Sequence, residues 1–141
     1  MPGEHPINIR LIDHVVIRAA DVGVLVDFYC EVLGCEIERG EDQSGLVQLR
    51  AGLSLIDIVA AASELGRGAG SLPDQQAPNM DHVCLQIAPW DSKAILNHLH
   101  RNGVAAGDVA SRYGADGYGP SIYIKDPEGN TVELKGPASV D

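Results

Sequence analysis

Two histidines occupy the same place in two similar stretches of the sequence. His14 lies in IDHVVI and His82 lies in MDHVCL. Each half of the chain also ends on a strand-like stretch with one carboxylate, Asp57 in LSLIDIVA and Glu133 in GNTVELKG. Two imidazoles and two carboxylates suit a divalent cation of borderline hardness. We therefore predict a metal site for Zn, Ni, Mn, Co or Fe(II).

A structural role is the alternative for each of these residues taken singly. A lone strand histidine is more often hydrogen-bonded to backbone, and a lone acid near a strand end is usually solvated. Both residue types recur at equivalent positions of the two halves, however. Packing alone does not explain that coincidence, so the repeat favours the metal site.

Strand alternation predicts that these polar side chains share one face of a sheet. Around Glu133, the neighbours Val132 and Leu134 point to the opposite side, and Asp57 alternates with aliphatic residues in the same way. We expect the aliphatic faces to pack against helices. The histidines and carboxylates then line the concave face.

Each histidine-containing strand is followed by a segment with the signals of a helix. Asp21 can cap the first helix and Gly34 can end it, while Asp91 and Gly103 do the same for the second. The apolar positions have the spacing of one buried helix face. They are Leu25, Phe28, Tyr29, Val32 and Leu33 in the first segment, and Ile95, Leu96 and Leu99 in the second.

Three strands are expected after each helix, so that each half has the order β-α-β-β-β. They lie near 35–39, 45–50 and 53–59 in the first half, and near 104–110, 120–125 and 131–135 in the second. DPEGN, residues 126–130, predicts a hairpin turn, and residues 111–119 are either a mobile substrate loop or a structural turn. The predicted fold class is α+β, with two tandem βαβββ modules forming a curved, cup-shaped mixed sheet and the helices on its outer face.

The halves are expected to form one domain, because each is too small to be stable by itself. The predicted domain covers 11–136, between an N-terminal tail (1–10) and a C-terminal tail (137–141). Within it, module one is 11–60 and module two is 80–136. Residues 61–79, rich in Gly, Ala and Pro, are the linker or a mobile flap.

Composition excludes several classes of partner. The formal net charge of −10 disfavours nucleic acid and anionic membrane surfaces. No apolar run reaches the length of a membrane span, and the N-terminal residues lack the layout of a signal peptide. The three cysteines form no C-x-x-C pair, so we expect reduced thiols and a cytoplasmic protein.

The sequence resembles the vicinal oxygen chelate superfamily of glyoxalases, bleomycin-resistance proteins and extradiol dioxygenases. The resemblance covers about residues 10–136. It is carried by IDHVVIRAADVGVLVDFYCEVLG, MDHVCLQI and GPSIYIKDPEGNTVELKG. The superfamily implies the paired modules described above, a small-molecule substrate and a homodimer, with the site built within one chain or across two.

The resemblance also implies roles for individual residues. His14, His82 and Glu133 match the metal ligands. Asp57 stands where glyoxalase I has a glutamate and is one methylene shorter, so direct ligation and ligation through water both stay open. Arg18 matches an arginine that contacts glutathione, although Ala61 replaces an asparagine that helps to hold it. Tyr123 and Ser121 lie on the strand that contacts substrate in similar proteins.

The implied activity is that of a metal-dependent lyase or isomerase of glyoxalase type, in which a Lewis-acidic metal stabilises an enediolate-like oxyanion. Glu133 is the expected base and Asp57 its partner. Two alternatives stay open. One is an Fe(II) ring-cleaving dioxygenase that uses His14, His82 and Glu133. The other is a non-enzymatic, bleomycin-resistance-like protein that binds its ligand without metal.

Overall fold

Two modules of the same strand and helix order follow one another along the chain. The structure is a computed structural model that describes residues 5–41, 45–63, 65–66 and 80–139. The first module contains β1 (His14–Ala19), α1 (Val22–Asp27), the π-helical turn η2 (Phe28–Val32), β2 (Glu36–Glu41), β3 (Leu46–Ala51) and β4 (Ser54–Ala60). The second contains β5 (Val83–Gln86), α2 (Ser92–Arg101), β6 (Ala110–Gly114), β7 (Gly117–Lys125) and β8 (Thr131–Lys135). The predicted α+β fold of two βαβββ modules is confirmed.

Each module forms a mixed four-stranded sheet with the same strand order. The orders are β1-β4-β3-β2 and β5-β8-β7-β6. In each sheet the first strand pairs in parallel with the last, and the other pairs are antiparallel. The strand that begins at His14 and the strand that directly follows His82 therefore each lie beside the strand that carries the carboxylate.

Both helices begin and end where the sequence predicts. The side chains of Asp21 and Asp91 accept hydrogen bonds from the backbone N–H groups of Val24 and Ala94. Gly34 and Gly103 follow the helices with φ of 80° and 70°, the left-handed conformation that a helix end favours in glycine. The sequence did not predict that the first helix finishes as a π-helical turn.

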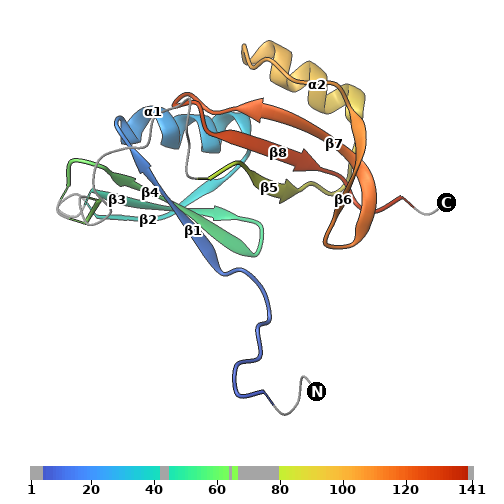
Figure 1. Ribbon diagram of the computed structural model, residues 1–141. Coiled ribbons are helices and arrows are strands. Elements are labelled where there is room, and N and C mark those ends of the chain that lie inside the picture. Colours follow the sequence, from blue (N-terminus) through green and yellow to red (C-terminus); the bar gives the residue numbers. More distant parts are fainter. Residues whose placement is uncertain (1–4, 42–44, 64, 67–79, 140–141) are drawn as a thin grey trace.

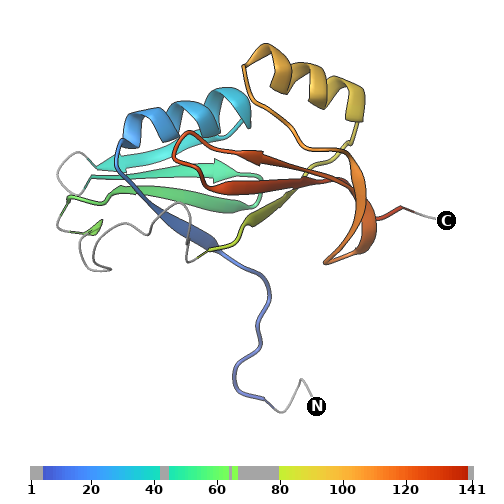
Figure 2. The same ribbon diagram turned by 45° about the horizontal axis from the view of Figure 1, so that its top comes forward.

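The two helices lie on the same side of the molecule, above the two sheets (Figures 1 and 2). Aliphatic residues of both sheets form one buried cluster with the helix residues Leu25, Phe28, Tyr29 and Leu99. Ile56 and Ile58 belong to this cluster, as do Val132 and Leu134. The predicted packing of aliphatic faces against the helices is confirmed. None of the described helices is long and apolar enough to span a membrane.

The DPEGN turn connects the modules as well as the strands β7 and β8. The buried Asp126 carboxylate accepts hydrogen bonds from the Tyr29 hydroxyl (2.9 Å) and from the backbone N–H groups of Glu128 and Asn130. The Glu128 carboxylate accepts from the backbone N–H groups of Ala20 and Asp21, both at 2.8 Å. The turn of the second module is thereby fixed to the start of the first helix.

The prediction for the strand before β7 was wrong. Residues 104–109 form no strand, and β6 instead spans Ala110–Gly114. Residues 111–119 form most of a tight hairpin in which Gly114 pairs with Gly117. The apolar residues around Val104 favour a strand. The Gly-rich segment 111–119 indicates a substrate loop or a turn, and does not indicate the strand that begins at Ala110. Of the predicted linker 61–79, residues 64 and 67–79 lie outside the described residues.

Candidate metal and substrate site

His14 and Asp57 form the first pair of candidate ligands. They lie on the neighbouring strands β1 and β4, where Val16 is the direct partner of Asp57. Asp57 is 3% exposed, and its Oδ2 accepts a hydrogen bond from Gln48 Nε2 at 3.0 Å. Its Oδ1 is buried and has no hydrogen-bond partner among the described residues. A buried carboxylate oxygen without a donor is costly, so this atom fits a cation as its partner.

His82 and Glu133 form the second pair, in the equivalent place of the other sheet. Cys84, two residues after His82, is the direct partner of Glu133 in the parallel ladder between β5 and β8. Glu133 is 5% exposed. His82 Nε2 lies 3.2 Å from Glu133 Oε1. The register therefore places the imidazole against the carboxylate.

An aspartate orients each of the two histidines. His14 Nδ1 lies 2.7 Å from Asp13 Oδ2, and His82 Nδ1 lies 2.7 Å from Asp81 Oδ2. Because a carboxylate only accepts, each Nδ1 carries a proton, and the Nε2 atom of each ring is left on the side away from the aspartate. This is the usual support of a metal-binding histidine. The hydrogen bond to Asp13 raises the pKa of His14, with a further contribution from the Asp57 charge.

Each aspartate contacts the histidine that directly follows it in the sequence. Alternation would place adjacent residues on opposite faces. However, β5 begins at Val83 and β1 begins at His14, so Asp81 and Asp13 lie before their strands. Outside the regular strand the aspartate side chain can turn to the histidine, although the Asp13 carbonyl still accepts a hydrogen bond from the Leu55 N–H of β4.

The second pair has the spacing of two ligands on one ion. Two ligand atoms about 2.1 Å from a common metal and about 90–110° apart are separated by about 3.0–3.4 Å. The His82–Glu133 distance of 3.2 Å falls within this range. With Nδ1 protonated, both facing atoms are acceptors, so a proton or a cation has to lie between them. The donor set and its spacing therefore fit a divalent metal.

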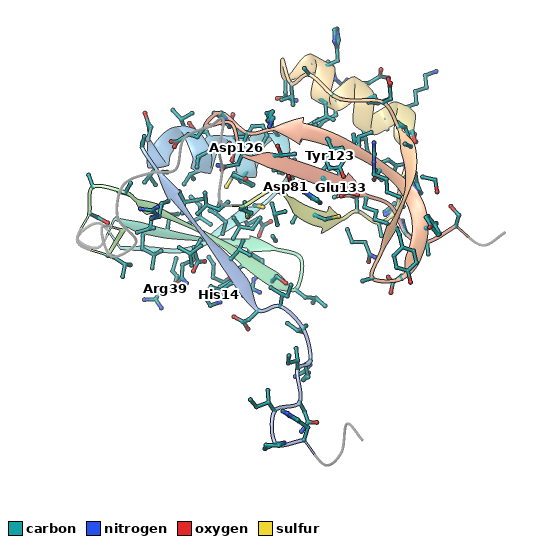
Figure 3. The ribbon with its side chains drawn as sticks, viewed as in Figure 1. His14, Arg39, Asp81, Tyr123, Asp126 and Glu133 are labelled. Carbon is teal, nitrogen blue, oxygen red and sulfur yellow. The ribbon has the colours of Figure 1, made fainter. Side chains whose placement is uncertain are left out.

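The two pairs lie apart within one chain. Figure 3 shows His14 under the first sheet, away from Glu133 in the second. Among the described residues, no three His, Cys, Asp or Glu side chains are grouped closely enough to hold a metal ion. One chain thus supplies two half-sites, and each half-site has one imidazole and one buried carboxylate.

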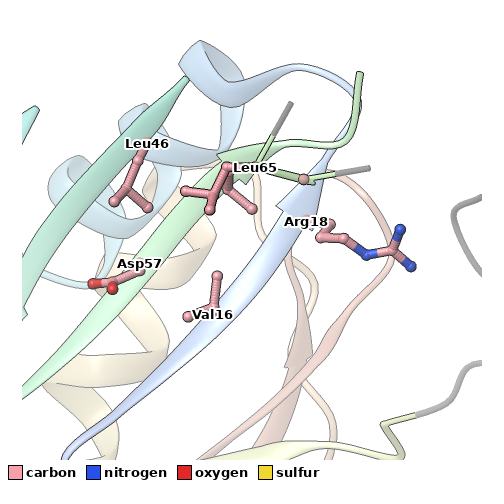
Figure 4. A pocket seen from close by; sticks show the side chains of 7 residues that line it. Val16, Arg18, Leu46, Asp57 and Leu65 are labelled. Carbon is pink, nitrogen blue, oxygen red and sulfur yellow. The ribbon is translucent and has the colours of Figure 1, made fainter. Parts of the chain in front are cut away.

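A cavity of about 350 Å³ lies beside the first half-site (Figure 4). Its lining combines Asp57 and Arg18 with the apolar side chains of Val16, Leu46, Val59 and Leu65. Val16 is 53% exposed, which is unusual for a valine in a strand. The first half-site therefore has room for a small, partly apolar ligand and a cation at its edge.

Tyr123 belongs to the second half-site, and Ser121 lies beneath it. Tyr123 pairs with Glu133 in the antiparallel ladder, and its ring contacts the His82 imidazole edge-on at 5.4 Å between centroids. Ser121 is fully buried, and its hydroxyl accepts from Arg112 Nη1 at 2.8 Å. Of the two substrate residues predicted on β7, Tyr123 lies beside the metal-ligand candidates, whereas Ser121 accepts hydrogen bonds from Arg112.

The Glu133 carboxylate contributes to a raised pKa of two acidic groups near it. Burial, with a contribution from Glu133, raises the pKa of the Cys84 thiol. Burial and then Glu133 also raise the pKa of the Tyr123 hydroxyl, while Arg112 opposes that rise. Both groups therefore keep their protons at neutral pH and can donate to an oxygen atom of Glu133 or of a ligand.

Four residues of this site were not predicted from the sequence. Asp13 and Asp81 repeat with the histidines, and that repetition was the signal that could have identified them. Gln48 and Arg112 have no such repeat. They reach the site only because β3 and β6 pair with strands that carry candidate residues or their support.

Comparison with known proteins places the chain in one superfamily. The family model of the Glyoxalase/Bleomycin resistance protein/Dioxygenase superfamily matches residues 11–134. The glyoxalase domain-containing protein RDO1 of Mycosarcoma maydis is 30% identical over 133 residues, which cover 93% of this chain and 70% of that protein. The virulence protein STM3117 of Salmonella typhimurium is 26% identical over 87% of this chain and 81% of its own length.

Solved structures share the fold over nearly their whole length. The crystal structure of STM3117 covers 92% of this chain and 98% of its own, with a TM-score of 0.72 and 25% identity. The lactoylglutathione lyase of Agrobacterium tumefaciens has a TM-score of 0.65 and 19% identity, covering 89% of this chain and 92% of its own. TnmS3, an antibiotic binding protein from Streptomyces sp. CB03234, has a TM-score of 0.64 and 17% identity, covering 94% and 99%. The last two likenesses concern the fold alone.

Proposed function

Because the chain belongs to the Glyoxalase/Bleomycin resistance protein/Dioxygenase superfamily, we propose that it is a divalent-metal-dependent lyase or isomerase of glyoxalase type. The observation that carries this proposal is the His82–Glu133 pair, with Nε2 and Oε1 3.2 Å apart and Nδ1 held by Asp81. The proposed ligands are His14, His82 and Glu133. Asp57, whose Oδ1 lacks a donor, is the proposed fourth ligand.

The complete site is proposed to form between two copies of the chain. Each chain carries an imidazole–carboxylate pair on each sheet, and the two pairs lie apart. In a homodimer, the first module of one copy can face the second module of the other, which brings four ligands together. The exposed Val16 beside Asp57 and the exposed apolar residues Ile7, Ile9 and Ile12 before β1 support a protein partner for this face.

The proposed substrate is a small molecule with two neighbouring oxygens. When bound, the metal ion supplies a Lewis acid that stabilises an enediolate-like negative charge on those oxygens. Glu133 takes the proton from the carbon beside the substrate carbonyl and returns it to the neighbouring atom. Glu133 is 5% exposed, which limits the access of water to that transfer.

The other polar residues position the substrate in this proposal. Asp57 is the partner carboxylate on the opposite side of the reacting carbon, where Gln48 holds its Oδ2. Arg18 lines the cavity next to Asp57 and is proposed to bind the substrate there. Tyr123 donates its hydroxyl to a substrate oxygen near His82, and the fully buried Ser121 holds Arg112.

A ligand-binding protein without catalysis is the second candidate. The apolar lining of the cavity beside Asp57 favours it, since Val16, Leu46, Val59 and Leu65 suit a hydrophobic ligand. TnmS3, which shares the fold, is an antibiotic binding protein. This candidate predicts that ligand affinity does not depend on His82.

An isomerisation assay separates these candidates. Protein loaded in turn with Zn²⁺, Ni²⁺, Co²⁺ or Mn²⁺ is assayed with the hemithioacetal of methylglyoxal and glutathione, with His82→Ala and the outer-helix variant Arg101→Gln alongside. We expect metal-dependent turnover that His82→Ala lowers at least about 100-fold, since the ligand is lost, while Arg101→Gln matches wild type. Oxygen uptake with catechol and Fe²⁺ identifies a ring-cleaving dioxygenase instead. Absence of turnover on every probe contradicts the proposal.

A further inference from the structure

Arg112, which no sequence motif identified, is held in a fixed position on the candidate site's face. Its Nη1 donates to the Ser121 carbonyl and to the Ser121 hydroxyl, both at 2.8 Å. Its guanidinium carbon lies 4.5 Å from the centre of the Tyr123 ring. The stacking and the two hydrogen bonds leave the guanidinium little freedom to rotate.

Part of the guanidinium remains available for a ligand. An arginine has five N–H donors, and both of those on Nη1 are used by Ser121. Within the described residues, the donors on Nε and Nη2 have no acceptor, and no carboxylate forms an ion pair with Arg112. A fixed guanidinium edge with free donors is the group that proteins use for bidentate binding of carboxylate or phosphate oxygens.

Lys135 adds a second positive charge beneath the same face. It pairs with Ser121 in the ladder between β7 and β8, two residues after Glu133. The residue is 4% exposed, and within the described part of the chain its ammonium donates one hydrogen bond, to the Gly136 carbonyl at 3.4 Å. A buried ammonium without an anion is unfavourable, so its surroundings favour an added negative charge.

Two glycines in the hairpin of β6 and β7 leave space for the Lys135 side chain. Gly119 is the direct partner of Arg112, and a Cβ atom there would lie 3.0 Å from Lys135 Nζ and 2.5 Å from the Pro137 carbonyl oxygen. A Cβ atom at Gly114 would lie 2.8 Å from Lys135 Cε. Both glycines thus make room for the lysine under the strand that carries Arg112. In a chain of net charge −10, this is a local positive region.

We propose that Arg112, supported by the charge of Lys135, forms a subsite for an anionic group of the substrate, a carboxylate or a phosphate-type oxyanion. Tyr123 links this subsite to the ligand candidates, because its ring contacts both the Arg112 guanidinium and the His82 imidazole. The substrate class is then a small anion whose vicinal oxygens reach the metal while its charged group lies on Arg112. The position of the vicinal oxygens rests on the proposed function, whereas the anion subsite does not.

Binding of simple anions tests the subsite directly. Acetate and inorganic phosphate are titrated into chelator-treated protein and followed by NMR chemical shifts, with acetamide as the neutral analogue of acetate. We expect millimolar binding of at least one anion, with the largest shifts around Arg112 and Tyr123, and weaker binding of acetamide. The anion that binds more tightly identifies the chemical class. Equal binding of acetate and acetamide would overturn the proposal.

Variants separate Arg112 from general surface charge. We expect Arg112→Gln to weaken anion binding at least about tenfold, and Lys135→Met to weaken it about threefold, because its charge acts without direct contact. Arg101→Gln, which removes the same charge from the outer helix, serves as the control. If Arg112→Gln fails to fold, Arg112→Lys replaces it, since it keeps the charge and loses the bidentate edge. Anion affinity unchanged in the Arg112 variant overturns the proposal.

A metal titration of the same proteins keeps this proposal distinct from the proposed function. Arg112→Gln should leave the affinity for Zn²⁺ unchanged, whereas Glu133→Gln should lower Zn²⁺ affinity and leave phosphate or acetate binding in place. If no variant or wild-type protein binds metal but Arg112 still governs anion binding, the metal proposal fails and the subsite stands. If metal binds and anion affinity does not depend on Arg112, the subsite proposal fails and the metal proposal stands.

Discussion

His82, the residue directly before β5, has its Nε2 3.2 Å from Glu133 Oε1 on β8, and β5 and β8 are parallel neighbours. The Asp81 carboxylate holds the proton of the same imidazole on its other nitrogen. A lone pair and a carboxylate thus point at one another in a largely buried position, an arrangement that a bound cation stabilises. In the first module Asp13 likewise contacts His14, and Asp57, one methylene shorter than a glutamate, lies on the neighbouring strand β4.

The aspartates that orient the histidines should be required for tight metal binding. Asp81→Asn and Asp13→Asn remove the charge that fixes the Nδ1 proton and raises the basicity of Nε2, so we expect each to weaken metal affinity about 10–100-fold. Competition with a chelating dye measures this effect. Asp108→Asn, an exposed aspartate before β6, is the matched control. Equal affinity in all three variants would show that the aspartates do not act through the histidines.

The Asp57 carboxylate should stabilise the metal-bound protein and destabilise the metal-free protein. Its Oδ1 is buried without a donor, whereas Oδ2 accepts from Gln48. Asp57→Asn removes the buried charge and retains an acceptor for Gln48. We expect urea denaturation in the presence of a chelator to show a gain of about 1 kcal/mol. Metal affinity should fall at the same time. A loss of stability without metal would mean that the carboxylate is satisfied in the folded protein.

Much of the fold followed from the sequence because its signals were local and occurred twice. Asp21 and Asp91 cap their helices as the sequence indicates, and strand alternation correctly placed Asp57 and Glu133 opposite the aliphatic core. The DPEGN turn forms where predicted. Repetition made each weak signal stronger, since the same pattern appeared in two places.

What the sequence did not reveal depends on contacts between distant segments. Gln48 meets Asp57, and Arg112 meets Tyr123, only after β3 and β6 pair with their neighbours. The role of Glu128 in binding the start of α1 joins residues more than one hundred positions apart. No local pattern encodes such contacts. For residues 111–119 the sequence left a substrate loop and a structural turn open, and the pairing of β6 with β7 shows a tight hairpin there.

Glu128 should stabilise the packing of the two modules. Its carboxylate accepts from the backbone N–H groups of Ala20 and Asp21 at the start of α1, where a negative charge is also favoured by the helix dipole. Glu128→Gln keeps the size and loses the charge, so we expect a loss of about 1 kcal/mol in the free energy of unfolding. Urea denaturation at low and high salt measures it. Glu31→Gln, near the end of η2, is the control and should change stability less.

Cys35 should make the protein lose stability at alkaline pH. Burial raises the pKa of its thiol from 9.0 to about 11. The unfolded chain then releases this proton first, so the stability present below pH 9 declines as pH rises towards 11. Denaturation curves between these pH values should fall by about 2 kcal/mol more for wild type than for Cys35→Ala. Parallel curves for the two proteins would contradict a buried, protonated thiol.

Metal content tests the central claim most directly. Protein purified without affinity tags or chelators, then reconstituted with Zn²⁺ or Mn²⁺ and freed of excess ion, is analysed by elemental mass spectrometry. We expect about one ion per chain in wild type and in His100→Ala on the outer helix, and less than about a tenth in His82→Ala and Glu133→Ala. Wild type with less than about a tenth of an ion per chain after reconstitution would contradict the metal site.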